Sequence, residues 1–547
     1  MSLLAAAMFA YRYILRATLA LASSYGSAAA TCAPSPVPII IGNSTLSNNQ
    51  VARGLQLSIG DPPQQFVFLP QWPLNNTFVY GTNGHCAVVA PACTTRRGGA
   101  YDMLASKSRS VTDKSSYPFD SAPFPPTSFV SDTLSLGKEL SLSGFPLGIP
   151  LNDWGAEDYH PMNAVGLGDN STLLTTLKST GKIVSRAWSM FWGRNGALAS
   201  AQLNGIFVLG GYDKAKTQGR PHSFPLADST ARCPTRMMIT ISDMILNFSN
   251  GTNASLFPRA ASNAIQACIV PDYPVLMTLP LDPYFSRFED LTNQSLQDRS
   301  LGLVYFANRY SSNSNVYTGD LTINFQPGFS VRIPNDQLVV PHRQINPNTG
   351  EITTNATGPD LVIISTQDVN KDDITQLGRQ FLSAAYLMAN LDANEFTLWE
   401  ANPTETQQLV AVDESNADIA SVCDANPPPP VTRPDGGGGS LSSGHIAGIA
   451  VAAVAFTAIV CAIVFVWRRR HRRRSAALGV RGPSTSNQGG LADKPSSPYG
   501  YNDGVPYQRS ELPGLGEQVY KSHQAADKLP APETGQRGES QPHELQG

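Results

Sequence analysis

Val67-Phe-Leu-Pro-Gln-Trp-Pro-Leu74 and Cys268-Ile-Val-Pro-Asp-Tyr-Pro-Val275 are the two stretches of this sequence that decide its fold. Each begins with a short apolar run, which predicts a buried strand. Each then continues with proline, a polar residue, an aromatic residue and a second proline. Proline lacks a backbone N–H and fixes φ, so this pattern ends the strand in a rigid turn. Two equivalent turns predict two equivalent lobes.

The residues around the first stretch resemble a known family. Upstream runs Arg53-Gly-Leu-Gln-Leu-Ser-Ile-Gly-Asp-Pro-Pro-Gln-Gln-Phe66, and downstream come Thr77-Phe-Val-Tyr80 and the close cysteines Cys86 and Cys93. This order resembles the opening of the pepsin-like aspartic peptidases. In that family a strand, an I-G-x-P-P-Q hairpin and a second strand deliver the D-T-G catalytic loop, and a short disulfide loop follows. The resemblance implies that Cys86 pairs with Cys93.

Further matches follow in family order and extend the resemblance over roughly residues 50 to 402. The matching segments are Asn163–Gly168, Gly205–Asp213, Arg236–Ile245 and Leu377–Tyr386, followed by Asp392. The fold implied is mainly β, a bilobal pepsin-like aspartic peptidase fold. We expect it to fill an ectodomain over residues 31–420, with an N-lobe over about 50–220 and a C-lobe over about 221–415.

The sequence departs from the family at the catalytic positions. In the family each lobe contributes one aspartate, and the pair shares a proton so that one carboxylate activates water while the other protonates the carbonyl. The first loop here has Pro70 or Gln71 at that place, and the second has Pro271 or Asp272; the alignment leaves both choices open. Neither proline nor glutamine can accept a proton near neutral pH. We therefore predict no catalytic residues.

The surroundings of these positions also differ from the family. Trp72 and Tyr273 replace the small threonines and glycines that let the backbone approach a substrate, and we expect both aromatic residues to line the cleft. Ser131–Gly137 resembles the strand after the family's flap. Tyr117–Pro126, which precedes it, contains no Tyr-Gly-x-Gly. The sequence therefore predicts a peptidase fold that lacks the peptidase chemistry.

Several features indicate secretion. Residues 1–30 have the basic, apolar and small-residue regions of a signal peptide, with cleavage expected after Ala30. Besides Cys86 and Cys93, four cysteines lie between this segment and the second apolar run, and they allow three pairings: Cys32, Cys233, Cys268 and Cys423. Asn-x-Ser/Thr glycosylation sites lie on the same side of that run, at Asn43, Asn75, Asn170, Asn247, Asn250, Asn253, Asn293 and Asn355.

Short runs rich in β-branched and aromatic residues predict strands through the middle of the chain. They are Gly205–Leu209, Met237–Ile241, Gly302–Phe306, Asp320–Phe325 and Leu361–Ser365. The best candidate for an amphipathic helix is Thr375–Met388, where apolar residues recur with helical spacing.

The C-terminal part predicts membrane attachment. A Pro/Gly-rich stalk at 421–444 leads to an apolar segment at 445–467, whose residues 446–467 carry no charge and are long enough to span the bilayer as one transmembrane helix. The basic run Arg468–Arg474 follows, so the positive-inside rule places the C-terminus in the cytosol. That run would contact anionic lipid. Residues 468–547 are predicted to be a disordered cytoplasmic tail that could hold a site for a cytosolic partner.

No other chemistry is indicated. The histidines lack metal-ligand spacing and there is no phosphate loop, so we expect no metal and no cofactor. A basic run next to a membrane span favours lipid over nucleic acid, and we expect no nucleic-acid partner. The prediction is a single-pass type I cell-membrane glycoprotein whose inactive ectodomain binds or senses a peptide or wall polysaccharide. The alternatives are an active membrane-anchored aspartic endopeptidase and a structural surface glycoprotein.

Overall fold

The computed structural model describes residues 32–423, except 73, 83–85, 87–90, 113–126, 138–139, 153–161, 197, 229–231, 258–263, 297 and 314. All described residues belong to one compact unit of the chain. The predicted signal peptide, membrane span and tail, most of the stalk, and the segment at 117–126 lie outside the described residues. Within the described part, none of the helices has the length and hydrophobicity needed to cross a membrane.

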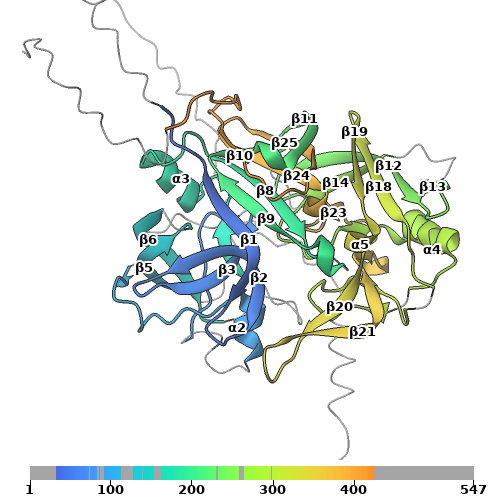
Figure 1. The fold of residues 1–547 in the computed structure, drawn as a ribbon, viewed down its shortest axis with the longest axis horizontal. Helices are drawn as coiled ribbons and strands as arrows, with labels where there is room; N and C mark the ends of the chain where they lie inside the picture. The colour runs from blue at the N-terminus through green and yellow to red at the C-terminus, as the bar shows by residue number, and fades with distance from the viewer. Residues whose placement is uncertain are drawn as a thin grey trace, which may run out of the picture. The chain divides into compact units, whose positions relative to one another are not determined.

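The described residues form a mainly β structure (Figure 1). The largest sheet has twelve strands, and its main path is β11-β25-β24-β8-β9-β1-β2-β3-β7. Its strands are β1 (Val37–Thr45), β2 (Val51–Ile59), β3 (Gln64–Gln71), β4 (Ser110–Val111), β5 (Thr127–Ser135), β6 (Ser141–Pro150), β7 (Asn163–Gly166), β8 (Ala187–Arg194), β9 (Leu203–Leu209), β11 (Thr217–Pro225), β24 (Ala385–Asn390) and β25 (Glu395–Ala401).

An eight-stranded sheet follows the path β19-β18-β12-β14-β23-β15-β22, with β13 paired to β12. Its strands are β12 (Met238–Asn247), β13 (Asn253–Ser255), β14 (Ile265–Ile269), β15 (Met277–Leu279), β18 (Asp320–Gln326), β19 (Phe329–Ile333), β22 (Ile363–Ser365) and β23 (Thr375–Leu377). A four-stranded sheet contains β16 (Asp298–Arg299), β17 (Asn308–Arg309), β20 (Val339–Ile345) and β21 (Ile352–Leu361), and a small sheet pairs β10 (Gly211–Asp213) with β26 (Leu409–Ala411).

Helices are short and few among the described residues. The α-helices are α2 (Ala92–Arg97), α3 (Thr172–Ser179), α4 (Ser286–Thr292) and α5 (Asn335–Leu338). The best capped is α3, where the hydroxyl of Ser171 accepts a hydrogen bond from Leu174 N at 3.2 Å. Its buried leucines attach it to the core.

The two decisive stretches occupy matching positions in the two large sheets. Strand β3 runs parallel to β7, and after the loop Phe78 pairs antiparallel with Ala164 and parallel with Gly148. In the second half, β14 runs parallel to β23, and after its loop β15 pairs antiparallel with β23 and parallel with β22. The chain thus makes the same strand–loop–strand arrangement twice.

Several predicted strands are confirmed. Gly205–Leu209 lies in β9, Asp320–Phe325 in β18, and the greater parts of Met237–Ile241 and Leu361–Ser365 in β12 and β22. The strand predicted over Gly302–Phe306 is wrong. Phe306 takes a positive φ of 64° and donates its N–H to Ser300 O at 2.7 Å, which turns the chain back on itself.

The helix predicted over Thr375–Met388 is also wrong. This segment forms β23, a single 3₁₀ turn at Phe381–Ser383 and then β24. Its apolar residues do have helical spacing, but almost every residue of the segment is buried, so there is no polar face for a helix to turn to solvent. Pairing of β24 between β8 and β25 overrides the local pattern.

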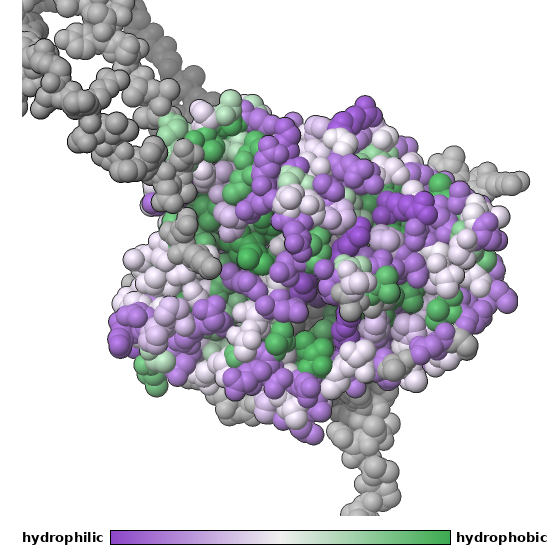
Figure 2. Space-filling model, viewed as in Figure 1, coloured by the Kyte–Doolittle hydropathy of each residue, from purple (hydrophilic) through white to green (hydrophobic). Residues whose placement is uncertain are grey.

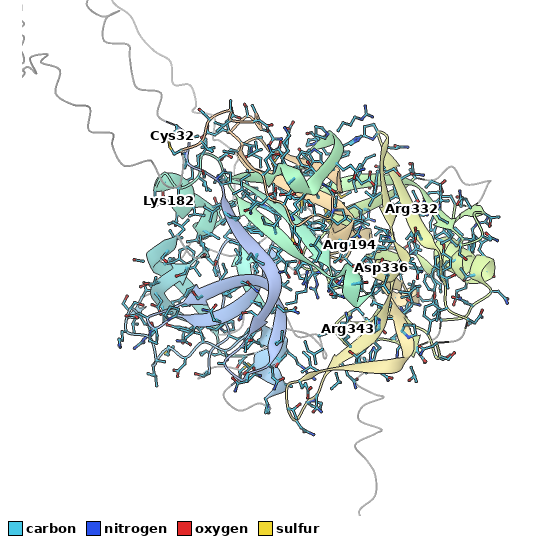
Figure 3. The ribbon with its side chains drawn as sticks, viewed as in Figure 1. Cys32, Lys182, Arg194, Arg332, Asp336 and Arg343 are labelled. Carbon is cyan, nitrogen blue, oxygen red and sulfur yellow. A yellow bond between two sulfur atoms is a disulfide. The ribbon has the colours of Figure 1, made fainter. Side chains whose placement is uncertain are left out.

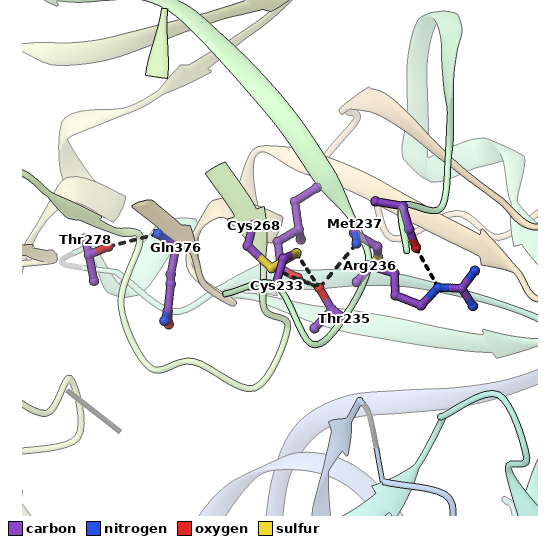
Figure 4. The surroundings of a disulfide bond; sticks show 9 residues. Cys233, Thr235, Arg236, Met237, Cys268, Thr278 and Gln376 are labelled. Atoms are coloured by element: carbon purple, nitrogen blue, oxygen red, sulfur yellow. Dashed lines mark hydrogen bonds between the residues drawn. A yellow bond between two sulfur atoms is a disulfide. The ribbon is translucent and has the colours of Figure 1, made fainter. Parts of the chain in front are cut away.

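Three disulfides stabilise this fold. Cys86 is bonded to Cys93, the pair that the family resemblance implied. Cys32 is bonded to Cys423, which joins the two ends of the described chain, and Cys233 is bonded to Cys268 at the C-terminal end of β14. Thr235 Oγ1 lies 3.2 Å from Cys268 Sγ and donates to Ile269 O at 2.6 Å. The disulfide and Thr235 thus hold the start of the second decisive stretch against the segment at Cys233–Thr235 (Figure 4).

Candidate functional site

The first loop begins at the end of β3 and buries its side chains. Gln71 and Trp72 are each only 5% exposed. Gln71 O accepts a hydrogen bond from Leu167 N at 3.0 Å, and Gly168 N donates to Leu74 O at 2.7 Å, so the loop is held against the segment after β7. The side-chain Nε2 of Gln71 is buried and has no hydrogen-bond partner among the described residues. The loop therefore presents a neutral amide at Gln71, one of the two residues predicted for the first catalytic position.

Trp72 connects this loop to the largest sheet. Its ring centroid lies 6.1 Å from that of Trp188 on β8, and Trp188 stacks on Phe207 of β9 at 5.7 Å. Trp72, which the sequence predicts to line the cleft, is 5% exposed and belongs to the main hydrophobic core. The aromatic ring fills the space that a small residue would leave beneath the loop.

The second loop is built in the same way but is held by an arginine. Val270 N donates to Leu377 O at 2.8 Å, and Arg379 N donates to Tyr273 O at 2.9 Å. The Arg379 guanidinium donates from Nη1 to the main-chain oxygen of Asp272 at 2.8 Å. Asp272 is 7% exposed, and Tyr273 packs partly buried against the main core.

Gly378 permits this close packing. A Cβ at this residue would collide with the main-chain oxygens of Val275 and Tyr273. A glycine is therefore required where the second loop crosses the segment after β23. This residue corresponds to Gly166, where a Cβ would collide with the backbone of Asn75 and Asn76 in the first loop.

Between the loops and the large sheet, two arginines stack on one tryptophan. Trp192 on β8 is 2% exposed, and the guanidinium carbons of Arg53 and Arg379 lie 5.6 Å and 5.3 Å from its ring centroid. Such cation–π contacts are favourable and stronger when desolvated. Desolvation by burial lowers the pKa of Arg53 to about 10, so the side chain remains a cation at neutral pH.

The predicted glycosylation sites differ in accessibility. Six of the eight asparagines are exposed: Asn43, Asn170, Asn250, Asn253, Asn293 and Asn355. Asn75 and Asn247 are half-buried and already use their side chains. Asn75 Oδ1 accepts from Asn170 N at 2.9 Å, and Asn247 Oδ1 accepts from Thr322 Oγ1 at 2.6 Å.

The described residues contain no cluster of three His, Cys, Asp or Glu side chains suited to a metal ion. A buried trio of Ser300, His342 and Asp360 does exist. Both Ser300 Oγ and the Asp360 carboxylate contact the same nitrogen, Nδ1 of His342, at 3.1–3.3 Å. A catalytic triad needs the serine and the carboxylate on opposite ring nitrogens. The trio is therefore a buried polar network between β20 and β21.

The sequence identified the two loops but missed the residues that support them. Trp192, Arg53 and Arg379 are far apart in the chain, and no local pattern marks them as neighbours. The structure brings them together because β2, β8 and the segment after β23 meet beneath the loops. A scan of the chain against protein-family models gives no match, and a search of curated proteins gives none either.

Proposed function

We propose that the described residues form a pepsin-like bilobal body whose catalytic centre has lost its chemistry and which acts in binding. The repeated strand–loop–strand arrangement supports the fold, since each half offers one loop in the same sheet environment. The ordered sequence resemblance supports it independently.

One observation carries the proposed loss of activity: β3 ends in Pro70 and Gln71, so neither residue predicted for the first catalytic position carries a carboxylate. A neutral amide can neither take a proton from water nor share one with Asp272. A lone Asp272 cannot act as general base and general acid in the same step. Its main-chain oxygen is held by Arg379, and Tyr273 and Trp72 fill the space around the two loops.

The function proposed is binding or sensing of a peptide or wall polysaccharide at the cell surface. The protein would be a single-pass type I glycoprotein, with residues from about 31 to 444 outside and 468–547 in the cytosol. Exposure of six predicted glycosylation sites on the described body agrees with this orientation. So does the Cys32–Cys423 bond, since disulfides persist in oxidising compartments.

Peptide cleavage by the purified full-length protein tests the proposal. We expect turnover orders of magnitude below that of an active aspartic peptidase from acid to neutral pH, and no further change in Asp272→Asn. Robust cleavage that a pepstatin-like inhibitor blocks and Asp272→Asn abolishes would refute the proposal and favour an active endopeptidase.

A further inference from the structure

Two arginines bond the main chain at the turn between β8 and β9, and a third, Arg194, is the last residue of β8. Arg53 donates from Nη2 to Trp192 O at 2.9 Å and to Leu203 O at 3.0 Å, at the two strand ends that flank the turn. From the other half of the molecule, Arg343 on β20 donates to Asn195 O at 2.8 Å and Gly196 O at 3.0 Å. Arg194 lies between these attachment points, paired in register with Leu203.

None of these three cations is neutralised by a described residue. Arg53 and Arg343 bond main-chain carbonyls, which orient a guanidinium but carry no net charge. Arg194 makes no side-chain hydrogen bond to any residue that the structure describes, and its Nε, like that of Arg53, is buried without a partner among them. Desolvation lowers the pKa of Arg53 and of Arg343, and no nearby carboxylate opposes that effect.

The arginines are held in place and retain some exposure. All three side chains are half-buried. In Figure 3, Arg194 and Asp336 are labelled next to each other in the middle of the view, with Arg343 below them; a Cβ at Gly196 in the turn would collide with Asp336 O. The Asp336 carboxylate accepts from Gln337 Nε2 at 2.9 Å and forms no ion pair with the arginines.

Exposed leucines flank the arginine cluster. Leu198 in the turn is 56% exposed, and Leu301 and Leu303 are 51% and 37% exposed. Leu303 N donates to Arg343 O at 2.8 Å, and the Arg343 side chain reaches from there to Gly196 O in the turn that carries Leu198. Arg343 therefore connects Leu303 with the turn. In the same view, Figure 2 shows hydrophobic surface interspersed with hydrophilic surface around this region.

We propose that Arg53, Arg194 and Arg343 form a binding site for an acidic peptide segment whose carboxylates are flanked by apolar side chains. Arginine presents a planar fork of donors that matches a carboxylate, and such charge-assisted bonds are the strong ones. The exposed leucines favour a peptide over a uronic-acid polysaccharide, which has no apolar side chains to cover them. Arg53 also lies over Trp192 in the support of the two loops, but the site uses neither catalytic position, so it does not depend on the loss of peptidase activity.

Binding of a short labelled peptide of alternating Glu and Leu to the full-length protein tests the site by fluorescence anisotropy. The matched peptide has Gln in place of Glu, and an oligogalacturonate serves as the polysaccharide probe. We expect the Glu peptide to bind, the Gln peptide to bind at least about tenfold more weakly, and the affinity to fall with salt.

Arg194→Gln is the decisive variant, because its side chain makes no hydrogen bond that folding needs. This substitution should lower the affinity for the Glu peptide about 10- to 100-fold and leave the unfolding midpoint of the protein unchanged. The control Arg332→Gln removes the same charge from an arginine on β19 that is paired with Asp320, and should have little effect. Absence of peptide binding, equal binding of the Gln peptide, or equal weakening by both variants would overturn the proposal. So would Arg194-dependent binding of the oligogalacturonate alone.

Discussion

A buried carboxylate in the first half provides a sharp test of the structure. Asp132 on β5 is fully buried and accepts hydrogen bonds from Tyr101 Oη at 2.6 Å, Ser108 Oγ at 2.5 Å and Thr133 N at 2.8 Å. Burial would by itself raise the pKa of Asp132, but the hydrogen bonds from Ser108 and Tyr101 outweigh it, and the pKa lies below its usual value. The ionised form therefore stabilises the folded protein.

The perturbation is Asp132→Ala, compared with Tyr101→Phe. A hydrogen bond to a charged acceptor contributes about 1.5–3 kcal/mol, so Tyr101→Phe should lower the free energy of unfolding by about that amount. Asp132→Ala loses every bond and leaves the Tyr101 hydroxyl buried without its acceptor, so the loss should reach about 3–5 kcal/mol. The exposed Asp298, on β16, gives the matched control, and Asp298→Ala should stay within about 0.5 kcal/mol.

The pH dependence gives the sign of the effect. A carboxylate with a lowered folded pKa contributes stability that is complete above its unfolded pKa of about 3.9 and is lost as the pH falls through the folded value. The difference between the wild type and Asp132→Ala, measured by urea unfolding, should therefore be constant from about pH 7 to about pH 5 and shrink below about pH 4. A difference below 0.5 kcal/mol, or one that grows on acidification, would refute the assigned role of Asp132.

Three further outcomes are expected. Gln71→Asp should not create peptidase activity, because Trp72 still fills the space beneath the loop; measurable cleavage by this variant would contradict that packing. Enzymatic deglycosylation should show one glycan fewer in Asn250→Gln than in the wild type but no change in Asn247→Gln, whose asparagine is engaged by Thr322; the opposite pattern would disprove the accessibility argument. Replacing Cys32 and Cys423 together by serine should cost about 2–5 kcal/mol in thermal or urea unfolding, since it frees a loop spanning almost the whole described chain; an unchanged midpoint would exclude a stabilising role.

The local sequence predicted the elements whose pattern and packing agree. The apolar run before Pro70 lies in β3, which continues through Pro70 and ends at Gln71, and the run before Pro271 forms β14, which ends at Ile269. In each case a short buried apolar run was enough to predict a strand. The short β-branched runs at β9 and β18 formed strands for the same reason. These elements carry enough local information to fix their type.

Prediction from the local sequence failed for two segments whose secondary structure is set by contacts with distant or neighbouring parts of the chain. Thr375–Met388 satisfies a helical period, yet its second half pairs with β8, a strand almost two hundred residues earlier in the chain, where Leu387 lies opposite Met190. A strand buried on both faces shows no alternation and cannot be distinguished from a buried helix by periodicity. Gly302–Phe306 failed for another reason, since the composition is that of a strand while Phe306 adopts a turn conformation fixed by Ser300.

The candidate site was also predicted only in part from the sequence. The loops were visible because proline and aromatic residues lie next to each other in the sequence, but the support beneath them was not. Arg53, Trp192 and Arg379 come from three separate segments and meet through one ring. An active aspartic site needs a carboxylate pair that can share a proton, and guanidinium groups nearby would favour ionisation of both carboxylates. Arg379 binds the Asp272 main chain and shares the Trp192 ring with Arg53, and this arrangement supports our proposal that the loops hold a fixed surface. If the proposal holds, introducing peptidase activity would require changes to this arginine–tryptophan support as well as to the loops.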